Sequence, residues 1–512
     1  MILEDIVARW GVLLAAVLPW LAVAAALALH DRTRHAATVT VALAELAIVA
    51  ALVPAAVAGR GGAVRLATLP GGVPFALRAD ALGVLFALLV AVLWVFATVY
   101  AAGYMAHEER RGHFFAAYAA SVATVVGVAF AANLLVLFVF YELLTLATYP
   151  LVVHYGTAEA RAAGRTYLAY TFAGGVAVFG GTALAHQITG TVAFVPGGVG
   201  LGSADAPAAT AAFALLVVGF GVKTALVPLH RWLPEAMAAP TPVSALLHAV
   251  AVVKSGAFGV LRVVLFVFGP GAVREFGVGL PLATAAAATV IVSSVLTLRQ
   301  DKLKRGLAYS TVGQLSYIVL GVALLAPAAV FGALLHLVAH GFMKITAFFS
   351  VGVVTHETGV DRVSEMDGVA RRLPATTTAF AVAAAGLVGI PGVAGFVSKL
   401  YVLLGAFEAG RPLLATTVLL SGLLKLLFFW PIVARAGFRT DPVADGDGVD
   451  DGGRGGLETP WSLLAPLLAT AALAVLFGVR PSAFPFFALA ERVVTDVLGD
   501  TAFDAGEVLA RG

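Results

Sequence analysis

The sequence predicts an all-α membrane protein that crosses the bilayer about 14 times, with roughly 20 residues in each span. Hydrophobic residues make up 61% of its 512 positions and charged residues 12%. A soluble domain carries roughly 45–50% apolar and about 25% charged residues, so the composition excludes a soluble protein with a large core. The formal net charge is only +3, which gives no support for nucleic-acid binding.

Each span is predicted from an apolar run that ends at a charged, Gly-rich or Pro-rich turn. The first span is expected to be retained, because Glu4 and Asp5 beside Arg9 make a poor positive region for a cleaved signal peptide. The segment 59–80 is predicted to be a short hairpin or extended loop outside the lipid. The predicted spans, numbered 1 to 14 in chain order, are 11–29, 36–58, 81–103, 113–131, 133–153, 165–189, 209–232, 243–268, 278–298, 307–325, 328–355, 375–406, 412–436 and 460–479.

Two further segments lie near the C-terminal end of the chain. The acidic, Gly-rich stretch 438–459 is predicted to be a mobile loop. The segment 486–498 directly follows Pro485 and has the apolar periodicity of an amphipathic helix.

Two of the predicted spans are interrupted, span 7 near Pro228 and span 12 near Pro391. Proline removes a backbone donor and clashes with the preceding turn. Irregular backbone at membrane depth is tolerated only where it is buried in protein or lines a wet cavity. Both spans also carry a lysine, Lys223 and Lys399. The two spans lie five apart and therefore run in opposite directions, a pattern that indicates an inverted repeat around a transport site.

Lysine and arginine residues in the short loops predict the orientation. Loops after odd-numbered spans, including the basic turn 299–305, hold about 17 of these residues, and the other side holds about ten. We therefore expect the odd-numbered loops to be cytoplasmic and both termini to lie outside.

Ionisable residues near the middle of the spans are the candidate transport groups, because a charge within lipid is costly and usually functional. Glu142 in span 5 needs a partner or a proton, and Lys223 is the obvious partner; the competing interpretation is a static ion pair that fixes helix packing. Lys254 has mostly apolar neighbours for two turns on either side. Desolvation favours its neutral amine, so Lys254, like Lys399, can gain and lose a proton. Lys425 better fits a side chain that reaches the interface.

Span 11 contains His336, His340 and Lys344, spaced by four and hence on one helix face. They cover roughly 12 Å along the membrane normal, and histidine titrates near neutrality, so the stripe can pass protons through water. Two alternatives remain open. Histidines at this spacing can share a metal ion, although no third ligand is visible, and a histidine can simply satisfy a backbone carbonyl. His248 could connect the lysine of span 7 to Lys254 in span 8.

Several kinds of site have no support in the sequence. There is no cysteine, which excludes cysteine-ligated iron–sulfur clusters and disulfides. No GxxxxGK[ST] motif is present, so ATP does not drive this chain directly. The Gly-rich segment 197–202 follows no predicted strand and is expected to be a loop. No cofactor, metal ion or catalytic centre is therefore expected.

Five segments combine intramembrane Lys, Glu or His residues with helix-breaking Pro or Gly. In these segments the chain resembles the antiporter-like proton-translocating subunits shared by NADH-quinone oxidoreductase (complex I), membrane-bound hydrogenases and Mrp-type cation/proton antiporters. The resemblance covers about residues 75–435. The segments are YELLTLATYPL (141–151), KTALVPLHRWLPEAMAAPTPVSALLHAVAVVKSGAFGVLR (223–262), DKLKRGLAYSTVGQLSYI (301–318), HLVAHGFMKITAFF (336–349) and GIPGVAGFVSKL (389–400).

The resemblance implies two inverted five-helix repeats, which divide the chain into residues 1–112, 113–268, 278–436 and 437–512. It also implies a role for each candidate residue along a proton route. Glu142 and Lys223 form the first ion pair, Lys254 is the central relay, His336 and His340 form the bridge, and Lys399 is the last group.

The function expected from the resemblance is that of a proton-translocating subunit of a multi-subunit, Mrp-type cation/proton antiporter in the cell membrane, closest to the D-type Mrp subunit. Its expected partners are other membrane subunits, the lipid bilayer, protons and sodium. The alternative is a proton-pumping subunit of a NADH-quinone oxidoreductase, a membrane-bound hydrogenase or an inorganic carbon transporter. A third class is a structural membrane anchor.

Overall fold

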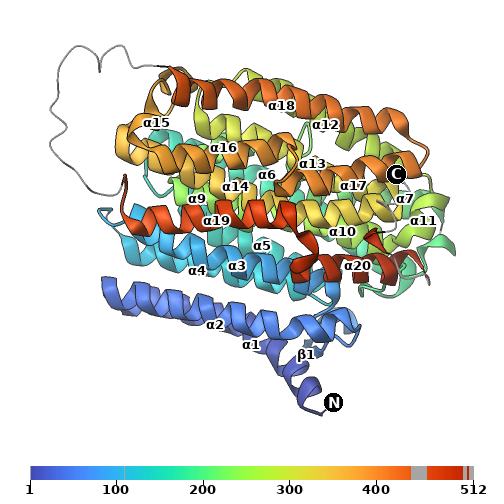
Figure 1. The fold of residues 1–512 in the computed structure, drawn as a ribbon. Helices are drawn as coiled ribbons and strands as arrows, with labels where there is room; N and C mark the ends of the chain where they lie inside the picture. Colours follow the sequence, from blue (N-terminus) through green and yellow to red (C-terminus); the bar gives the residue numbers. More distant parts are fainter. Residues whose placement is uncertain (1, 109, 204, 440–457, 500–503, 507–512) are drawn as a thin grey trace, which may run out of the picture.

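The computed structural model describes residues 2–108, 110–203, 205–439, 458–499 and 504–506. Within them, thirteen helices are long and apolar enough to cross a membrane. Two half-length helices, α16 and α17, together fill one further position. The long helices lie side by side in one direction (Figure 1), which confirms the predicted all-α polytopic fold. Most of the acidic stretch 438–459, predicted to be a mobile loop, lies outside the described residues.

Most spans are single helices whose bounds agree with the sequence prediction within a few residues. Helix α1 begins at Ile2 rather than at 11, and α6 is a second exception, because it begins at Ala158 rather than at 165. Its start is fixed by Thr157, whose side chain accepts a hydrogen bond of 3.1 Å from the backbone of Ala160. The single helices are α1 (Ile2–Ala28), α2 (Asp31–Val57), α3 (Ala81–Tyr104), α4 (Arg111–Phe130), α5 (Leu134–Val152), α6 (Ala158–Thr189), α12 (Gly279–Leu298), α13 (Leu303–Leu324), α14 (Pro327–Thr358), α18 (Pro412–Phe438) and α19 (Trp461–Val479).

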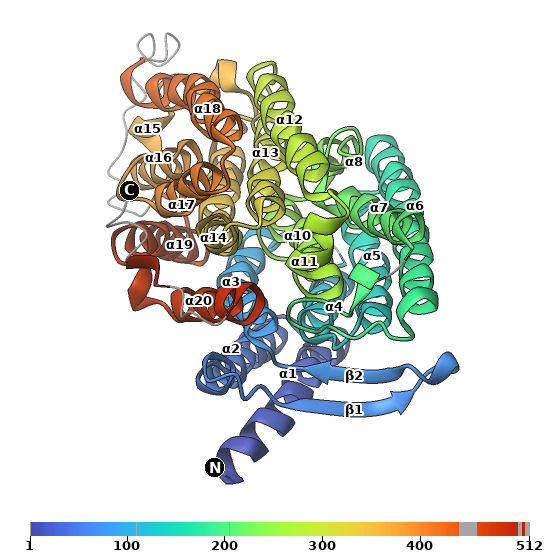
Figure 2. The ribbon, with the colours of Figure 1, turned by 90° about the vertical axis from the view of Figure 1, so that its right-hand side faces the viewer.

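The predicted hairpin between spans 2 and 3 is confirmed. Strands β1 (Ala63–Thr68) and β2 (Pro74–Arg78) pair antiparallel at one end of the bundle (Figure 2). The backbone N–H of Ala79 donates to the carbonyl of Gly62 at 2.9 Å. This bond places the start of α3 beside the end of α2.

The first helix break lies slightly upstream of the predicted position. Helix α7 (Ala206–Thr224) ends where Ala225 adopts the left-handed conformation with φ 63°, three residues before Pro228. The residue before a proline disfavours helical backbone, so the chain cannot resume the helix until Pro228 is passed. It continues through the short helix α8 (Trp232–Glu235) and a 3-10 turn at Ala236–Ala238.

Span 8 is less regular than the sequence predicted. It is built from α9 (Thr241–Ala245), α10 (Val252–Arg262) and α11 (Gly269–Glu275), joined by two π-helical turns. The first π turn, Leu246–Val250, contains His248 and lies one turn before Lys254. Such turns are frequent at functional sites, and this one changes the direction in which the side chains after it point.

The second break occurs at the predicted place. Helix α16 (Pro374–Val388) stops at Gly389, which has φ 106°, and α17 (Ala394–Glu408) starts after Gly392, which has φ 87°. Glycine adopts these left-handed values at little cost. With Pro391 between them, the two glycines interrupt the helix for a few residues, and α17 then continues across the bundle to the start of α14, where the carboxylate of Glu408 accepts from the N–H of Ala328 at 3.2 Å.

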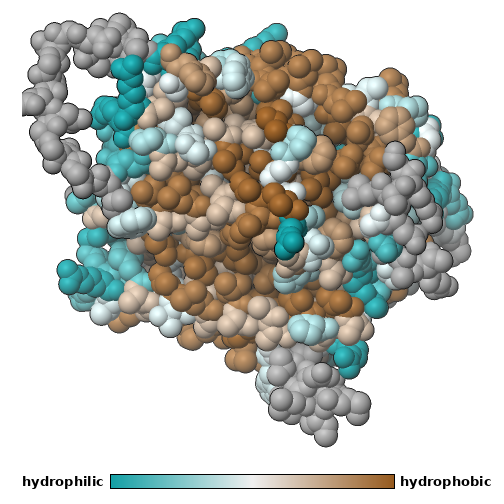
Figure 3. All heavy atoms as spheres, viewed as in Figure 1, coloured by the Kyte–Doolittle hydropathy of each residue, from teal (hydrophilic) through white to brown (hydrophobic). Residues whose placement is uncertain are grey.

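Helix α14 lies at the centre of the bundle and is enclosed by α3, α13, α16, α17 and α19 (Figure 2). The predicted C-terminal amphipathic helix is confirmed as α20 (Pro485–Leu498), which packs against α3 and α14. Apolar side chains cover much of the middle of the outer surface, and hydrophilic ones gather towards both ends (Figure 3). This distribution fits a membrane-embedded bundle.

A candidate proton relay of buried lysines and histidines

Five lysines lie within the membrane-spanning part of the bundle. Four of them are fully buried and Lys399 is 6% exposed. Among the described residues, none of the five forms an ion pair with a carboxylate. A buried charge without a counterion is costly, so the cluster cannot hold five positive charges at once. The five are Lys223, Lys254, Lys344, Lys399 and Lys425.

Lys223 and Glu142 are neighbours but not a direct pair. In the last turn of α7, the amine of Lys223 donates to the carbonyl of Tyr141 and lies 3.4 Å from the centroid of its ring. The carboxylate of Glu142 lies against Gly175 of α6, which leaves no room for a Cβ, and its Oε1 has no hydrogen-bond partner. The ion pair that the resemblance implies is therefore not a direct one among the described residues, and a contact through water stays a prediction. Successive residues of a helix point about 100° apart, so a lysine on Tyr141 misses the next side chain.

Lys254 contacts the central helix. Its amine donates to the carbonyl of Leu337 and lies 3.4 Å from Nδ1 of His340. The histidine within hydrogen-bond reach of Lys254 is thus His340, whereas His248, which was expected to connect to Lys254, lies beside Thr311. Close by, Gly256 packs on the backbone of Lys223 with no space for a Cβ, which brings the end of α7 against α10.

The three buried histidines share one arrangement. Each has its Nδ1 near a protein partner and its Nε2 without one. Nδ1 of His248 lies 2.9 Å from the hydroxyl of Thr311, and Nδ1 of His336 lies 2.8 Å from the hydroxyl of Ser398. His248 therefore faces α13 and contacts neither lysine that it was predicted to connect. The free Nε2 atoms leave each ring one nitrogen able to exchange a proton.

The predicted stripe on α14 is confirmed as one buried face that reaches three helices. The rings of His336 and His340 stack with centroids 6.2 Å apart. One turn beyond His340, the amine of Lys344 donates to the carbonyl of Leu307 on α13 at 2.8 Å. No group of three or more His, Asp or Glu side chains in the described part of the chain is arranged to hold a metal ion.

Lys399 sits at the second helix break. Its amine donates to the carbonyls of Leu387 at 2.5 Å and Val388 at 3.0 Å, the last two residues of α16. The C-terminal end of a helix carries a partial negative charge. The broken helix thereby stabilises a proton on Lys399 without a carboxylate.

Lys425 belongs to the same cluster, contrary to the expectation that it reaches the interface. Its amine donates to the hydroxyls of Tyr317 at 3.2 Å and Ser421 at 3.0 Å, and it lies 4.4 Å from the centroid of the Tyr317 ring. The amine of Lys399 lies 5.3 Å from the same centroid. Tyr317 therefore stands between two lysines that share one buried space.

The scarcity of lysine relative to arginine in the sequence could have indicated that Lys425 is buried with the other lysines. The chain has 32 lysine and arginine residues, but only seven are lysines, and five of these are the buried ones. Arginine keeps its proton under all ordinary conditions, whereas a buried lysine can release one. The seven are Lys223, Lys254, Lys302, Lys304, Lys344, Lys399 and Lys425.

Comparison with known proteins assigns the family. The profile described as "NADH:quinone oxidoreductase/Mrp antiporter, TM" matches residues 131–424. The chain belongs to this family. A second profile, for the N-terminus of complex I chain 5, matches residues 70–115. The antiporter-like subunit is 35% identical over 408 residues to NADH-quinone oxidoreductase subunit N of Desulforudis audaxviator, across 76% of this chain and 79% of that protein.

Another relative is much longer than this chain. This chain is 35% identical over 333 residues to the A/B subunit of a probable K(+)/H(+) antiporter of Rhizobium meliloti. The match covers 64% of this chain but only 32% of that protein. Among solved structures, the Mrp complex from Dietzia sp. contains a chain that matches with a TM-score of 0.84 at 23% identity, over 100% of this chain and 99% of that one. Respiratory complex I from Thermus thermophilus contains a chain that matches with a TM-score of 0.80 at 24% identity, over 96% of this chain and 100% of that one. These likenesses confirm the fold.

An ion pair that sequence reasoning missed holds the hairpin end of the antiporter-like subunit together. The buried guanidinium of Arg262 donates to both carboxylate oxygens of Asp80, at 2.6 and 2.8 Å. Asp80 also caps α3 by accepting the backbone N–H of Gly83 at 2.8 Å. Burial alone would raise the pKa of Asp80, but the charge and hydrogen bonds of Arg262 outweigh it and hold that pKa below its ordinary value.

A cavity of about 680 Å³ enters the bundle beside the basic turn 299–305. Its lining is largely polar and includes Thr166, Glu235 and Thr241. The hydroxyl of Thr241 lies 3.3 Å from that of Tyr104 at the cavity wall. His248 follows Thr241 by about two turns, roughly 10 Å, along the same span.

Proposed function

We propose that the chain is the proton-translocating subunit of a multi-subunit, Mrp-type cation/proton antiporter. The observation that carries the proposal is the series of buried lysines and histidines that extends across the bundle from α7 to α18. In the described part of the chain none of them forms an ion pair with a carboxylate. Each member can hold a proton, and each lies beside another member or beside a polar side chain. A static scaffold has no need of several unpaired lysines, because each costs stability without forming a salt bridge.

The proposed route has two branches that meet at the central helix: one comes from Lys223 beside Glu142 through Lys254, and the other begins at the cavity beside the basic turn. Protons pass from Thr241 to His248, whose hydrogen bond to Thr311 points towards α13, and then to Lys344 and His340. From His340, Lys254 lies on one side and His336 on the other. His336 passes the proton towards Tyr317 and its two lysines, with water completing the steps that exceed hydrogen-bond length.

Repulsion between like charges couples the protonation of neighbouring sites along the route. A proton on Lys425 disfavours one on Lys399, because both amines surround the ring of Tyr317. At the opposite end, the carboxylate of Glu142 favours the charged form of Lys223 through space. Movement of that carboxylate would change where the next proton rests. Ion exchange on partner subunits could be coupled to the relay by this movement.

The proposed location is the cell membrane, with both termini outside and the basic turn in the cytoplasm. Because the chain has no cysteine, single cysteines report the orientation directly. Leu66→Cys in β1, where Leu66 is 47% exposed, should react with a membrane-impermeant maleimide in intact cells. Arg299→Cys should react only after permeabilisation. The reverse pattern would overturn the orientation.

A second candidate is a proton-pumping subunit of a NADH-quinone oxidoreductase. It is favoured by the 35% identity to subunit N, which spans 79% of that protein. Purification of the native complex followed by mass spectrometry separates the two candidates. Small membrane subunits together with sodium- or potassium-driven proton flux in proteoliposomes support the antiporter. Quinone- or hydrogen-oxidising partners and the absence of cation-driven flux would overturn it.

A further inference from the structure

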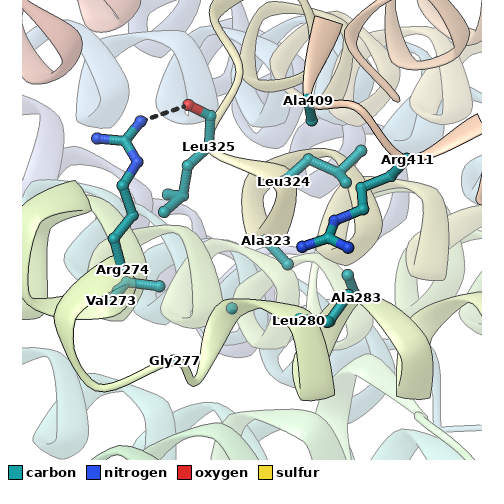
Figure 4. A pocket seen from close by; sticks show the side chains of 11 residues that line it. Val273, Arg274, Gly277, Leu280, Ala283, Ala323, Leu324, Leu325, Ala409 and Arg411 are labelled. Carbon is teal, nitrogen blue, oxygen red and sulfur yellow. Dashed lines mark hydrogen bonds between the residues drawn. The ribbon is translucent and has the colours of Figure 1, made fainter. Parts of the chain in front are cut away.

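A pocket of about 240 Å³ lies at the hairpin end of the bundle, away from the relay (Figure 4). Its walls come from α11, the start of α12, the α13–α14 turn and the α17–α18 turn. Arg274 and Arg411 flank it from opposite sides, and none of the residues that line it carries a carboxylate. The pocket therefore presents two positive charges and no negative one.

The two guanidiniums are held differently. Arg274 donates to the carbonyl of Leu325 at 3.1 Å, which fixes its head at the wall (Figure 4). Arg411, between α17 and α18, forms no ion pair with a carboxylate in the described part of the chain, and its guanidinium extends over the pocket. Each arginine has further N–H groups available, and the planar guanidinium matches a phosphate oxygen pair.

The surroundings place the pocket at the level of lipid headgroups. Helices α12 and α18 both begin beside it, and most of their exposed side chains are apolar. Leu280 in the first turn of α12 is 45% exposed, and Leu413 and Leu420 of α18 are 79% and 48% exposed. A molecule with a phosphate at the pocket could lay acyl chains along these leucines.

We propose that this pocket binds the phosphate group of an anionic phospholipid. Arg274 and Arg411 contact the phosphate, and the outer faces of α12 and α18 receive the acyl chains. Because α12 begins the second half of the bundle and α11 ends the first, a lipid bound here joins the two halves at their seam.

Native mass spectrometry of the full-length chain in detergent tests the proposal, with phosphatidylglycerol, phosphatidylcholine and inorganic phosphate as separate probes. We expect phosphatidylglycerol to be retained most strongly. The variants Arg274→Gln and Arg411→Gln should each weaken it about tenfold, the factor for losing one hydrogen bond to a charged group. Arg480→Gln, an exposed arginine of the same end outside the pocket, is the matched control and should bind normally.

Three outcomes would overturn the lipid assignment. One is equal retention of phosphatidylcholine and phosphatidylglycerol, and another is an equal loss in the Arg480→Gln control. The third is saturable binding of inorganic phosphate with no preference for the lipid, which would make the pocket a site for free anions. If a Gln variant fails to fold, Arg274→Lys or Arg411→Lys replaces it, because lysine keeps the charge but loses the paired N–H donors of the guanidinium. The measurement is then how much the lipid raises the thermal stability of that variant.

An independent observation concerns Glu45, a carboxyl residue that the relay does not use. Glu45 lies near the middle of α2 and is fully buried. Neither of its carboxyl oxygens has a hydrogen-bond partner among the described residues. An ionised, unpaired carboxylate at this depth would be very costly.

Polar groups on α3 lie at the same depth. Helices α1 to α4 pack as a ring, α1 on α2 and α4, and α3 on α2 and α4. Counting 1.5 Å per residue from the hairpin end puts both Glu45 and Trp94 at about 18–20 Å. Trp94 and Thr98, one turn apart and fully buried, also lack partners for the indole N–H and the hydroxyl.

Helix α1 supplies the complementary acceptor. Gly11 packs against Leu52, and two turns further into the membrane this antiparallel register places Glu45 opposite the turn that contains Pro19. Proline has no N–H, so the carbonyl of Ala15, four residues earlier, loses its usual helical donor. A protonated carboxyl needs both an acceptor for its O–H and donors for its C=O.

We infer that Glu45 is a neutral, proton-binding carboxyl inside the four-helix ring, hydrogen-bonded through enclosed water to the Ala15 carbonyl and to Trp94 and Thr98. The indole N–H can only donate, which argues against a metal cation at this position. The site is separate from the relay of α7 to α18.

Infrared spectroscopy of the full chain in lipid tests this inference. A protonated carboxylic acid gives a C=O stretch distinct from that of a carboxylate. We expect such a band at neutral pH, a shift of that band in D₂O, and its loss in Glu45→Gln but not in Glu365→Gln, an exposed control. Trp94→Phe and Thr98→Val keep the carboxyl and should move the band. A band unchanged in Glu45→Gln, or insensitive to both neighbouring substitutions, would overturn the inference.

Discussion

The amine of Lys254 on α10 lies 3.4 Å from Nδ1 of His340 on α14. Helix α10 belongs to the first half of the bundle and α14 to the second, so this contact crosses the seam between the predicted repeats. The amine also donates to the Leu337 carbonyl, one turn before His340 on the same helix. With no carboxylate paired to either side chain, the two are suited to holding one proton between them.

The first prediction follows from this contact. Lys254→Arg should lose proton flux nearly as completely as Lys254→Ala, because arginine keeps the charge and bulk but does not release its proton. The measurement is flux in proteoliposomes that hold the whole complex, with assembly checked by native gel. Arg480→Lys, at an exposed position outside the relay and its cavity, should transport normally. Near-normal flux in Lys254→Arg would remove the carrier role.

The second prediction concerns Glu142. Glu142→Gln should reduce flux to a small fraction with little loss of assembled complex, because the amide cannot influence the charge of Lys223. The matched control is Glu365→Gln in an exposed loop. Loss of assembly together with normal transport by the remaining complex would show that Glu142 is structural.

Glycines of α6 allow a finer test of the same carboxylate. A Cβ at position 175 would collide with the side chain of Glu142, whereas a Cβ at Gly180 would meet only Leu215 at 3.8 Å. Gly175→Ala should therefore displace the carboxylate and lower flux, while Gly180→Ala on the same helix should not. Both variants gain helix propensity, by up to about 1 kcal/mol. An equal change of flux in the two would therefore show that displacement of the Glu142 carboxylate is not the cause.

The fourth prediction extends the relay to Lys425. Lys425→Arg and Lys425→Met should both remove most of the flux, since the first cannot deliver a proton and the second cannot bind one. Tyr317→Phe removes the hydroxyl that contacts Lys425 and Ser421 but keeps the ring, and should slow flux less severely. Retained flux in Lys425→Met would end the route at Lys399.

The fifth prediction concerns stability. Asp80→Asn should lower the unfolding free energy by about 3–5 kcal/mol, because it leaves Arg262 buried and unpaired. Asp205→Asn, which changes a helix cap on α7 without an ion pair, should cost about 1 kcal/mol or less. Thermal unfolding in detergent gives the comparison. Adding Arg262→Met to Asp80→Asn should recover most of the loss.

The same pair sets the direction of a pH effect. The pKa of Asp80 is lower in the folded protein than in the unfolded chain, because Arg262 outweighs the effect of burial. The pair's contribution is therefore fully present above the unfolded value of about 3.9 and is lost as pH falls through the folded value. Asp80→Asn should abolish this acid-dependent part of the stability curve.

Much of the architecture could be predicted because lipid imposes strict rules on a chain. A span needs a certain apolar length, and Pro or Gly within it must break the helix, so spans, hairpin and the break at Gly389 were readable. The break in α7 was predicted near Pro228, and the helix already ends three residues earlier, at Ala225, because the residues before a proline also leave the helix. The π turn around His248 has no composition of its own and was invisible. The inverted repeat and the D-type assignment remain predictions.

The sequence by itself determined which residues are the candidate transport groups. Burying an ionisable group within an apolar run is costly, and such groups can be recognised in the sequence without coordinates. They are Glu142, Lys223, Lys254, His336, His340, Lys344 and Lys399. Only the tertiary structure decided their partners. It turned Lys223 to the carbonyl of Tyr141, placed His340 rather than His248 beside Lys254, and turned Lys425 inward to Tyr317. It also joined Asp80 to Arg262 across 182 residues. Helix rotation and π turns set which way a side chain faces, and these depend on packing between helices far apart in the chain.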